Sequence, residues 1–336
     1  MENKILTVVI PAYNVGKYLE EELLTFLDVR ILNDIEILII NDGSQDNTSK
    51  IASEFEKRYP DTVSLINKKN GGHGSTINKG IELAHGKYFK VVDGDDWVNT
   101  NDFVNLVMKL KTEDSDVVLT SYKRVIVKDK IEEPVELSGL VYFKKLRLED
   151  TIEELVGLYQ MHSITIKTEI LHQIPKISEQ CFYVDQEYCL YPIKYVSSII
   201  CYPYNVYRYR VGSAEQSMNK KNMQKNRMMH ERVTLNLLKY CLNMQDIEYK
   251  KKFLEKRVSK MCERQITIIM SLSISDEHKE ELRGFLNIIK SKSRRIYNDI
   301  PGKKAWILKK FGIKSYWFVA TLLHIKYRIY SRTDLN

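Results

Sequence analysis

Acidic residues cluster in the segment Asp93-Gly94-Asp95-Asp96, which directly follows the apolar run 88–92. Three carboxylates within four residues repel one another, and this costs stability unless a cation or a hydrogen-bond donor lies among them. An acidic surface patch is the alternative, but the apolar residues before the cluster and Trp97-Val98 after it favour a buried strand. Mg²⁺ binds one or two carboxylates together with phosphate oxygens and water. The cluster therefore predicts a site for a divalent cation and a diphosphate.

Two further polar segments have the residue types of a ligand site. Asn41-Asp42-Gly43-Ser44 follows a second apolar run, and Asp42 can accept hydrogen bonds from a nucleotide base or ribose; a simple turn before a helix is the alternative. In Gly71-Gly72-His73-Gly74, glycines precede a helix expected from Ser75, so backbone N–H groups can approach an anion. That segment matches neither a Walker A nor a GxGxxG pattern, and a glycine-rich turn holding a helix cap is the alternative.

The elements that must position these segments alternate through the first 120 residues. Apolar runs typical of strands are separated by stretches with helical spacing, which predicts right-handed crossovers and a parallel sheet. Ligands bind beyond the carboxyl ends of such strands, so we expect the three polar segments at one edge of the sheet. The expected strands are 5–10, 35–40, 63–66, 88–92 and 116–120.

The rest of the chain divides into a less regular part to about residue 218 and a helical part, 219–336. The first is rich in Tyr and Lys, whereas the second has long stretches with helical spacing. The sequence thus predicts an α/β sheet flanked by helices, followed by a helical C-terminal region. The expected elements are strands at 122–127, 164–167 and 198–202 and helices at 222–242, 248–271 and 277–293.

Composition limits the setting in which the protein works. The 336 residues include five cysteines, an odd number without a CxxC pair, which favours a reducing compartment over a disulfide framework. No apolar run reaches the length of a membrane span, and the N-terminus does not resemble a signal peptide, so we expect a cytoplasmic location. The net charge of +8 favours anionic partners: nucleic acid, a membrane surface or phosphorylated substrates.

The segment 303–332 concentrates basic residues, because its eight Lys and Arg side chains are accompanied by no Asp or Glu and by many aromatic residues. A solvated helix packed on the preceding α/β domain is one interpretation. The other is an interfacial helix at an anionic membrane surface, where aromatic rings lie at the headgroup level. Nucleic-acid binding ranks lower, because no recognition motif accompanies the charge. We expect peripheral association with the inner face of the cell membrane.

The first 120 residues resemble the inverting family 2 glycosyltransferases with the GT-A fold. This resemblance implies a Rossmann-like, mostly parallel sheet of the nucleotide-diphospho-sugar transferase kind over 1–218, with a nucleotide-sugar half (1–120) and an acceptor half (121–218). It extends only thinly beyond residue 120. The motifs that carry it are Val9-Ile10-Pro11-Ala12-Tyr13-Asn14, Asn41-Asp42-Gly43-Ser44, Gly74 to Asn78 with Gly80, and Val92-Asp93-Gly94-Asp95-Asp96-Trp97.

The resemblance also implies an activity. A hexosyltransferase-type enzyme would move one sugar from a UDP-sugar to an acceptor hydroxyl with inversion, using Mn²⁺ or Mg²⁺, in the synthesis of a bacterial surface polysaccharide or glycolipid. The acceptor would be a saccharide or a lipid-linked saccharide. By this resemblance Asp42 holds the base, Asp95 the ribose or donor sugar, and Asp96 the metal. Further donor-site residues implied are Pro11, Tyr13, Gly74, Asn78 and Asp93.

A catalytic base and a basic loop are implied in the second half of this region. Asp185 in Tyr183-Val184-Asp185-Gln186-Glu187-Tyr188 matches the family's base, which takes the proton of the attacking hydroxyl. A capping Asp at a helix start is the alternative, with Glu187 as the second candidate base. Arg208 and Arg210 could pair with phosphate oxygens, and Gln216 follows on the same loop; an exposed alternating strand is the alternative.

Two other interpretations of the whole chain remain open. A sugar-phosphate nucleotidyltransferase would need a glycine-rich signature near its N-terminus, and residues 9–14 lack one. A non-catalytic relative acting as a partner in a membrane assembly would tolerate Ala at Asp96 and Asp185. The sequence retains both acids, which favours the enzyme.

Overall fold

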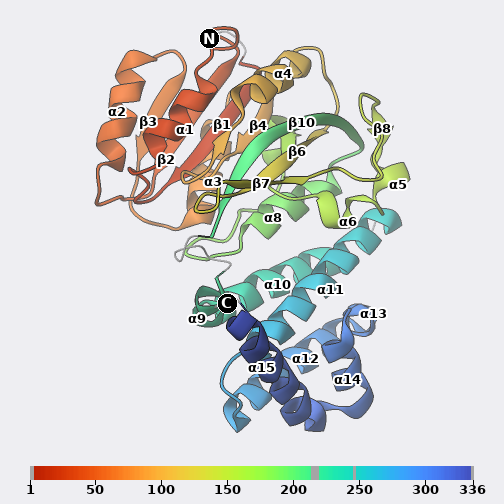
Figure 1. Cartoon of the computed structure of the whole chain (residues 1–336). Coiled ribbons are helices and arrows are strands. Elements are labelled where there is room, and N and C mark those ends of the chain that lie inside the picture. Colours follow the sequence, from red (N-terminus) through yellow and green to blue (C-terminus); the bar gives the residue numbers. More distant parts are fainter. Residues whose placement is uncertain (1–3, 213–218, 245–246, 334–336) are drawn as a thin grey trace. The chain divides into compact units, whose positions relative to one another are not determined.

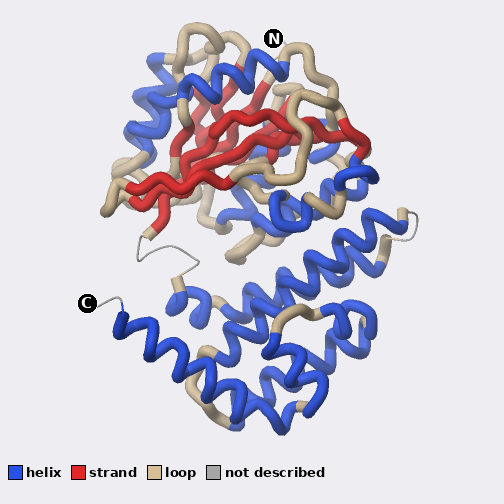
Figure 2. Tube along the Cα trace, turned by 45° about the vertical axis from the view of Figure 1, so that its right-hand side comes forward, coloured by secondary structure: helices blue, strands red, loops and turns tan. Residues whose placement is uncertain are grey.

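The computed structural model describes residues 4–212, 219–244 and 247–333. The chain divides into two compact units, residues 1–214 and 215–336. The described part of the first unit contains a sheet with helices on both faces, and that of the second is helical (Figure 2). Each unit is described by itself below.

The strands of the first unit form one sheet, and ten of them lie among the described residues. Its order is β3-β2-β1-β4-β9-β6-β10-β5, with β7 added beside β6 and β8 beside β10 (Figure 1). The bounds are β1 Leu6–Ala12, β2 Ile35–Asn41, β3 Val63–Asn67, β4 Tyr88–Val91, β5 Trp97–Val98, β6 Val117–Ile126, β7 Ile131–Val135, β8 Leu146–Arg147, β9 Ile164–Lys167 and β10 Ser198–Val211.

The expected mostly parallel sheet is confirmed. β1 pairs in parallel with β2 and β4, β2 with β3, and β6 with β10. The short strand β9 runs antiparallel between β4 and β6, which alternation along the sequence does not indicate. Two of the expected strands, 116–120 and 122–127, form the single strand β6, and the strand expected at 198–202 continues to Val211.

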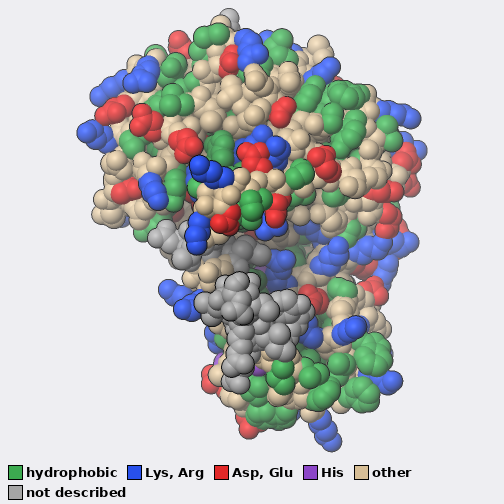
Figure 3. All heavy atoms as spheres, viewed as in Figure 1, with side chains coloured by type: hydrophobic (Ala, Val, Ile, Leu, Met, Phe, Trp, Pro, Cys, Tyr) green, Lys and Arg blue, Asp and Glu red, His purple; other side chains and the backbone are tan. Residues whose placement is uncertain are grey.

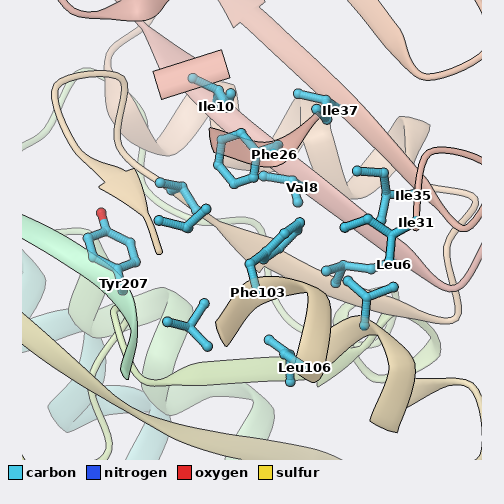
Figure 4. Close-up of a cluster of buried hydrophobic side chains, with 14 of the residues drawn as sticks. Leu6, Val8, Ile10, Phe26, Ile31, Ile35, Ile37, Phe103, Leu106 and Tyr207 are labelled. Atoms are coloured by element: carbon cyan, nitrogen blue, oxygen red, sulfur yellow. The ribbon is translucent and has the colours of Figure 1, made fainter. Parts of the chain in front are cut away.

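Helices cover both faces of this sheet. The apolar residues of β1 and β2 that point to one side pack under α1, α2 and α4, and Phe26 meets Phe103 edge-on at 5.1 Å (Figure 4). On the other face Gly80 of α3 lies directly against Val9, and Phe89 lies beside Tyr188 of α8. The bounds are α1 Leu19–Phe26, α2 Thr48–Arg58, α3 His73–Leu83, α4 Thr100–Leu110, α5 Leu148–Thr151, α6 Leu155–Leu158, α7 Thr168–Leu171, α8 Asp185–Leu190 and the 3₁₀ helix η1 Tyr191–Lys194.

The carboxyl ends of β1, β2 and β4 meet at one edge of the sheet. The N–H of Asp42 donates to the carbonyl of Ala12, and Gly94 lies close to the carbonyl of Pro11. The β1–β4 pairing ends at Val9 and Val91, before Pro11, which has no N–H to continue a ladder. β1 and β4 therefore separate here, whereas β1 and β2 stay paired to Ala12 and Asn41.

The second unit is built around α11, against which α9, α10, α12, α13, α14 and α15 pack. The helix expected at 222–242 is divided at Asn226 into two helices. Among the described residues no helix is both long enough and apolar enough for a membrane span. The bounds are α9 Lys220–Lys225, α10 Arg227–Leu242, α11 Glu248–Met270, α12 Asp276–Lys292, α13 Arg294–Asp299, α14 Lys303–Phe311, η2 Ile313–Ser315 and α15 Tyr316–Thr333.

Candidate active site

Strand β10 holds the acidic loop that follows β4. Asp96 is 1% exposed, and its Oδ2 accepts a hydrogen bond from Tyr207 Oη at 2.6 Å while its Oδ1 accepts one from the Arg210 N–H at 2.7 Å. Tyr207 Oη also accepts from the Asp93 N–H at 3.1 Å. The ring of Tyr207 belongs to the apolar core, and its hydroxyl is the polar end of that ring (Figure 4). The core thereby fixes the position of the acidic loop.

The two arginines expected at the diphosphate have different surroundings. The Arg210 guanidinium lies between the rings of Tyr18 and Trp97, 4.5 and 4.6 Å from their centroids, and its Nε donates to the carbonyl of Asp95 at 2.6 Å. The Arg208 side chain is buried and donates to the carbonyl of Asn205 at 2.5 Å. The structure therefore brings Arg210 to the acidic loop and does not bring Arg208 there.

Two histidines approach the acidic loop from other elements. His73, the first residue of α3, has its Nε2 2.8 Å from Asp93 Oδ1. His162, before β9, stacks on Tyr209 at 4.4 Å, and its buried Nδ1 has no hydrogen-bond partner among the described residues. Ligand atoms of Asp93, Asp96 and His162 all lie within 4.8 Å of one another. Two carboxylates and an unpartnered imidazole nitrogen make a donor set that fits a divalent cation.

Negative charge is concentrated at this loop beyond what the chain neutralises. Burial, then the charges of Asp95 and Asp93, raise the pKa of Asp96 well above its usual range. Burial and Asp93 raise the pKa of Asp95 to about 6. Burial alone would also raise the pKa of Asp93, but the charge and hydrogen bond of His73 lower it. A bound cation would favour the charged form of all three carboxyls.

A fourth carboxyl, Glu22 of α1, lies behind the loop and was not anticipated from the sequence. It is fully buried, and neither of its carboxyl oxygens has a hydrogen-bond partner among the described residues. Burial, followed by the charges of Asp96, Asp95 and Asp93, raises its pKa well above the usual range. Glu22 therefore adds to the excess of acidic groups around the loop.

The Asp42 carboxylate binds groups of the chain itself. Its Oδ1 accepts from Lys68 Nζ at 2.6 Å and from the Gly71 N–H at 2.9 Å, and its Oδ2 accepts from the Gly72 N–H at 2.8 Å. Lys68 Nζ also donates to Ser75 Oγ at 2.8 Å. Asp42 thus fixes the glycine segment at the start of α3.

Gly74 and Asn78, both expected at the donor, contact the segment 177–179. A Cβ on Gly74 would lie 2.0 Å from the carbonyl oxygen of Ser178, so only glycine allows this close approach. Asn78 clamps the backbone of Ile177, with Nδ2 donating to its carbonyl at 2.9 Å and Oδ1 accepting from its N–H at 3.0 Å. Helix α3 therefore anchors the chain that leads to Asp185.

Asp185 is the first residue of α8, and Gln186 Nε2 donates to its Oδ2 at 2.7 Å. Burial lowers the pKa of His73, but the charge and hydrogen bond of Asp93 raise it, and the net change is upward. Asp185 lies near enough to His73 that its charge adds to this rise. The second candidate base, Glu187, is fully buried and accepts hydrogen bonds from the N–H and the hydroxyl of Ser178. Asp185 is therefore the better placed of the two acids.

The remaining expected residues are spread along the same edge or lie outside the described part. Pro11 is buried at the end of β1, and the ring of Tyr13 is exposed just beyond it. Gln216 lies outside the described residues. Sequence reasoning missed Tyr207, although its neighbour Arg208 was expected at the diphosphate, and it gave His162 no role at the acidic loop.

Comparison with known proteins places this site in a family. The model of glycosyl transferase family 2 matches residues 7–174, which are half of the chain and include the glycine segment, the acidic loop and His162. The chain belongs to glycosyl transferase family 2.

Two relatives from Bacillus subtilis each match about a third of the chain. The uncharacterized glycosyltransferase EpsJ of Bacillus subtilis (strain 168) is 36% identical over 114 residues, 34% of this chain and 33% of EpsJ. The minor teichoic acid biosynthesis protein GgaB of the same organism is 33% identical over 106 residues, 31% of this chain and 12% of GgaB. The chain thus spans about a third of the length of EpsJ and much less of GgaB.

A solved structure resembles the chain over nearly its whole length. S. aureus TarS 1-349 in complex with UDP-GlcNAc superposes with a TM-score of 0.68 and 18% identity, covering 94% of this chain and 90% of that one. At this identity the likeness shows the fold, which is GT-A-like with a helical C-terminal region.

Proposed function

We propose that this chain is a metal-dependent glycosyltransferase that moves one sugar from a UDP-sugar to an acceptor hydroxyl with inversion. The observation that carries the proposal is the meeting of the acidic loop Asp93–Asp96 with Asp185 around His73, at the carboxyl edge of a parallel sheet. Family membership supports the reaction class. The UDP-GlcNAc complex of a protein with the same fold supports UDP as the nucleotide.

The nucleotide is proposed to bind at the ends of β1 and β2, where Pro11, Tyr13 and Asp42 lie. The exposed ring of Tyr13 is available to a base, and Asp42 keeps the adjoining glycine segment in place. Asp95 is proposed to contact the ribose or the donor sugar. Arg210 would act from beside the acidic loop, since its Nε already donates to the Asp95 carbonyl.

A divalent cation, Mn²⁺ or Mg²⁺, is proposed to be held by Asp96, and the donor set around it includes Asp93 and His162. When bound, such a cation stabilises the negative charge that develops on a departing diphosphate. The chain supplies the surroundings. Tyr207 and the Arg210 N–H orient the Asp96 carboxylate, and the excess acidity of the loop favours cation binding.

Asp185 is proposed as the general base. Inversion requires the acceptor oxygen to attack the anomeric carbon from the side opposite the diphosphate, and a carboxylate there can take its proton. Asp185 lies at the end of a segment that α3 anchors through Gly74 and Asn78. That anchoring holds the base at a fixed place relative to the donor loops.

The acceptor is proposed to be a growing surface saccharide or a lipid-linked saccharide of a bacterium. The name of GgaB, a teichoic acid biosynthesis protein, supports a cell-surface product. A lipid-linked acceptor would place the reaction at the inner face of the cell membrane. Residues 1–218 would carry both substrates, with 219–336 as the membrane-associating region.

A donor-binding panel and one variant test the proposal. We expect UDP to raise the melting temperature only with Mn²⁺ present, and GDP, CDP and dTDP to do so less, because a ligand that binds only the folded state stabilises it. Asp185→Asn should keep this shift but lower the transfer rate by about 10²–10⁴-fold. Asp276→Asn, in the first turn of α12, is the matched control and should change neither.

Each outcome bears on a separate part of the proposal. Transfer that persists in Asp185→Asn would show that another group is the base. If none of the four nucleotides raises the melting temperature of the wild-type chain, the proposed donor site is wrong. That result would favour a non-catalytic partner.

A further inference from the structure

Helix α15 is apolar on two opposite sides. One side packs inside the helical unit, where Tyr316, Val319 and Ala320 are buried and His324 Nε2 lies 3.2 Å from the carbonyl of Met270. These positions recur every three to four residues, as expected for the buried stripe of a helix. Over residues 316–325, α15 therefore packs on the helical unit by this side.

The opposite side of α15 carries large apolar side chains that the unit does not cover. They recur at helical spacing and are between 48% and 62% exposed, and the series is Phe318, Leu322 and Ile325; Trp317, 41% exposed, lies at the edge of the packed side. On α14, Trp306 and Phe311 are also exposed and meet edge-on at 6.3 Å. Hydrophobic side chains gather on the lower part of the helical unit in Figure 3. Single exposed apolar residues are ordinary, but a repeated series on one helix indicates a contact surface.

The segment that contains α14 and α15 has charged side chains of one sign, and acids of other helices pair with lysines in or beside it, Glu263 with Lys304 and Asp276 with Lys279. Residues 303–332 include eight Lys and Arg and no acid. Lys310 Nζ lies 4.8 Å from the ring centroid of Trp306, and Lys279 Nζ of α12 lies 5.6 Å from that of Trp317. Aromatic rings accompanied by lysines suit the headgroup region of a bilayer, where the rings enter the apolar boundary and the ammonium groups face phosphates.

We propose that the outward side of α14 and α15 docks on an anionic lipid bilayer, with both helices lying in the interface. The absence of acids from 303–332 favours anionic lipid over a second copy of the same positive segment, which would repel it. The inference deepens the proposed function by naming the surface that would bring the site to a membrane-bound acceptor. Docking itself requires no sugar transfer.

Vesicle co-sedimentation of the full chain, without donor or acceptor, tests the surface. We expect binding to phosphatidylcholine vesicles that contain phosphatidylglycerol and little binding to phosphatidylcholine alone. The double variant Phe318→Ser/Leu322→Ser should weaken binding roughly tenfold to a hundredfold, because two exposed apolar side chains no longer enter the bilayer. The matched control Leu24→Ser/Val29→Ser changes two exposed apolar residues of the catalytic unit and should bind as the wild type.

A second pair of variants tests the charge. Lys303→Gln/Lys310→Gln/Lys314→Gln should weaken binding by about fivefold for each lysine removed near the surface. Lys50→Gln/Lys57→Gln/Lys128→Gln removes the same charge from exposed positions elsewhere and should weaken it much less. If both triple variants weaken binding equally, only net charge matters and the docking surface is overturned.

The remaining outcomes separate this surface from other occupants and from the enzyme proposal. Unchanged vesicle binding in Phe318→Ser/Leu322→Ser would overturn the inference. So would a vesicle-free dimer in analytical ultracentrifugation that this variant dissociates, because a second copy would then cover the face. Metal-dependent UDP binding should be the same in all these variants. Vesicle binding therefore tests the docking surface, and UDP binding independently tests the proposed function.

Discussion

Asp42 and Asp96 both follow parallel strands of the same sheet, at the same edge, but their surroundings are opposite. Asp42 accepts from an ammonium group and two backbone N–H groups, and its carboxylate holds the glycine segment. Asp96 accepts from a hydroxyl and one N–H, and its neighbours include the carboxyls of Asp95 and Asp93. The chain supplies donors that neutralise the Asp42 carboxylate. Asp96 instead lies among other acidic groups.

This difference indicates that the two acids have different tasks at one edge of the sheet. Asp42 fixes a loop, and Asp96 is available to a cation. A matched buried carboxylate stabilises the loop around it, whereas unmatched carboxylates lower stability until an ion binds. The core holds the acidic loop in place, because Tyr207 belongs to the apolar cluster and its hydroxyl donates to Asp96. Four measurements test the contrast, in order of expected effect.

Asp96→Asn should have the largest effect of the four. It should lower the transfer rate and leave the stability of the metal-free protein undiminished. Removing the carboxylate from the proposed cation site should lower the transfer rate by about 10²–10³-fold, comparable to the loss of a key electrostatic group in other enzymes. Metal-free stability should not fall, because Asn removes a carboxyl whose charged form is disfavoured by burial and by Asp95 and Asp93. Transfer assays with saturating Mn²⁺ and urea unfolding without metal measure the two effects. A variant that unfolds at lower urea than the wild type would contradict the contrast.

Asp42→Asn should act mainly on stability. It leaves the half-buried Lys68 without its counter-ion and removes an acceptor from the Gly71 or Gly72 N–H, so we expect a loss of about 2–3 kcal/mol. Urea unfolding measures it. Asp28→Asn removes the carboxylate of the exposed Arg30 ion pair and is the control, with little change expected. Equal stability of the two variants would mean that Asp42 does not hold the loop.

Ionisation of Asp95 and Asp96 should take stability away from the metal-free protein as pH rises through the acidic range. The pKa of Asp95 is about 6 in the folded chain, above its ordinary value, so the folded state binds more protons than the unfolded one between these values. The contribution of this group to stability then falls with rising pH, by about 2–3 kcal/mol. The pKa of Asp96, raised in the same direction, adds to the fall.

Urea unfolding at several pH values measures this slope, and Asp95→Asn should flatten it. Mn²⁺ should restore stability at the higher pH, because it binds the ionised carboxylates. If stability depends on pH equally in the wild type and in Asp95→Asn, then the pKa of Asp95 is not raised in the folded protein.

Tyr207→Phe should have the smallest of the four effects. It keeps the ring in the core and removes the hydroxyl that bonds Asp96 and the Asp93 N–H, so we expect a cost of about 1 kcal/mol. The transfer rate should fall less than in Asp96→Asn. Tyr202→Phe, which removes a hydroxyl bonded to Glu113, is the matched control and should leave transfer unchanged. Equal losses of transfer would mean that Tyr207 does not orient the loop.

Much of the fold could be predicted because its signals are local. Apolar runs at 5–10, 35–40 and 88–92 correspond to β1, β2 and β4, since the residues of a buried parallel strand are apolar on both faces. The place of β9 between β4 and β6 could not be predicted, because partner choice depends on the whole sheet. Asn78 was expected at the donor, but its amide holds Ile177, a residue 99 positions away.

Glu22 shows why part of the site had no sequence signal. An acid in the first turn of a helix is typical of an exposed position near the positive end of the helix dipole. Only the packing of α1 against the sheet buries it beside the acidic loop, and only this burial, with the charges of the loop, raises the pKa of its carboxyl. His162 is a similar case, since residues from other strands surround it.

The sequence by itself determined the alternation of strands and helices, the acids at strand ends and the acid-free basic segment 303–332, because residue type and spacing suffice for these. Tertiary structure alone decided which carboxylates the chain neutralises and which side of α15 stays uncovered. The hydroxyl that bonds Asp96 comes from Tyr207, 111 residues away. Hydrogen bonds, burial and charge interactions depend on distance in space, and the fold sets that distance.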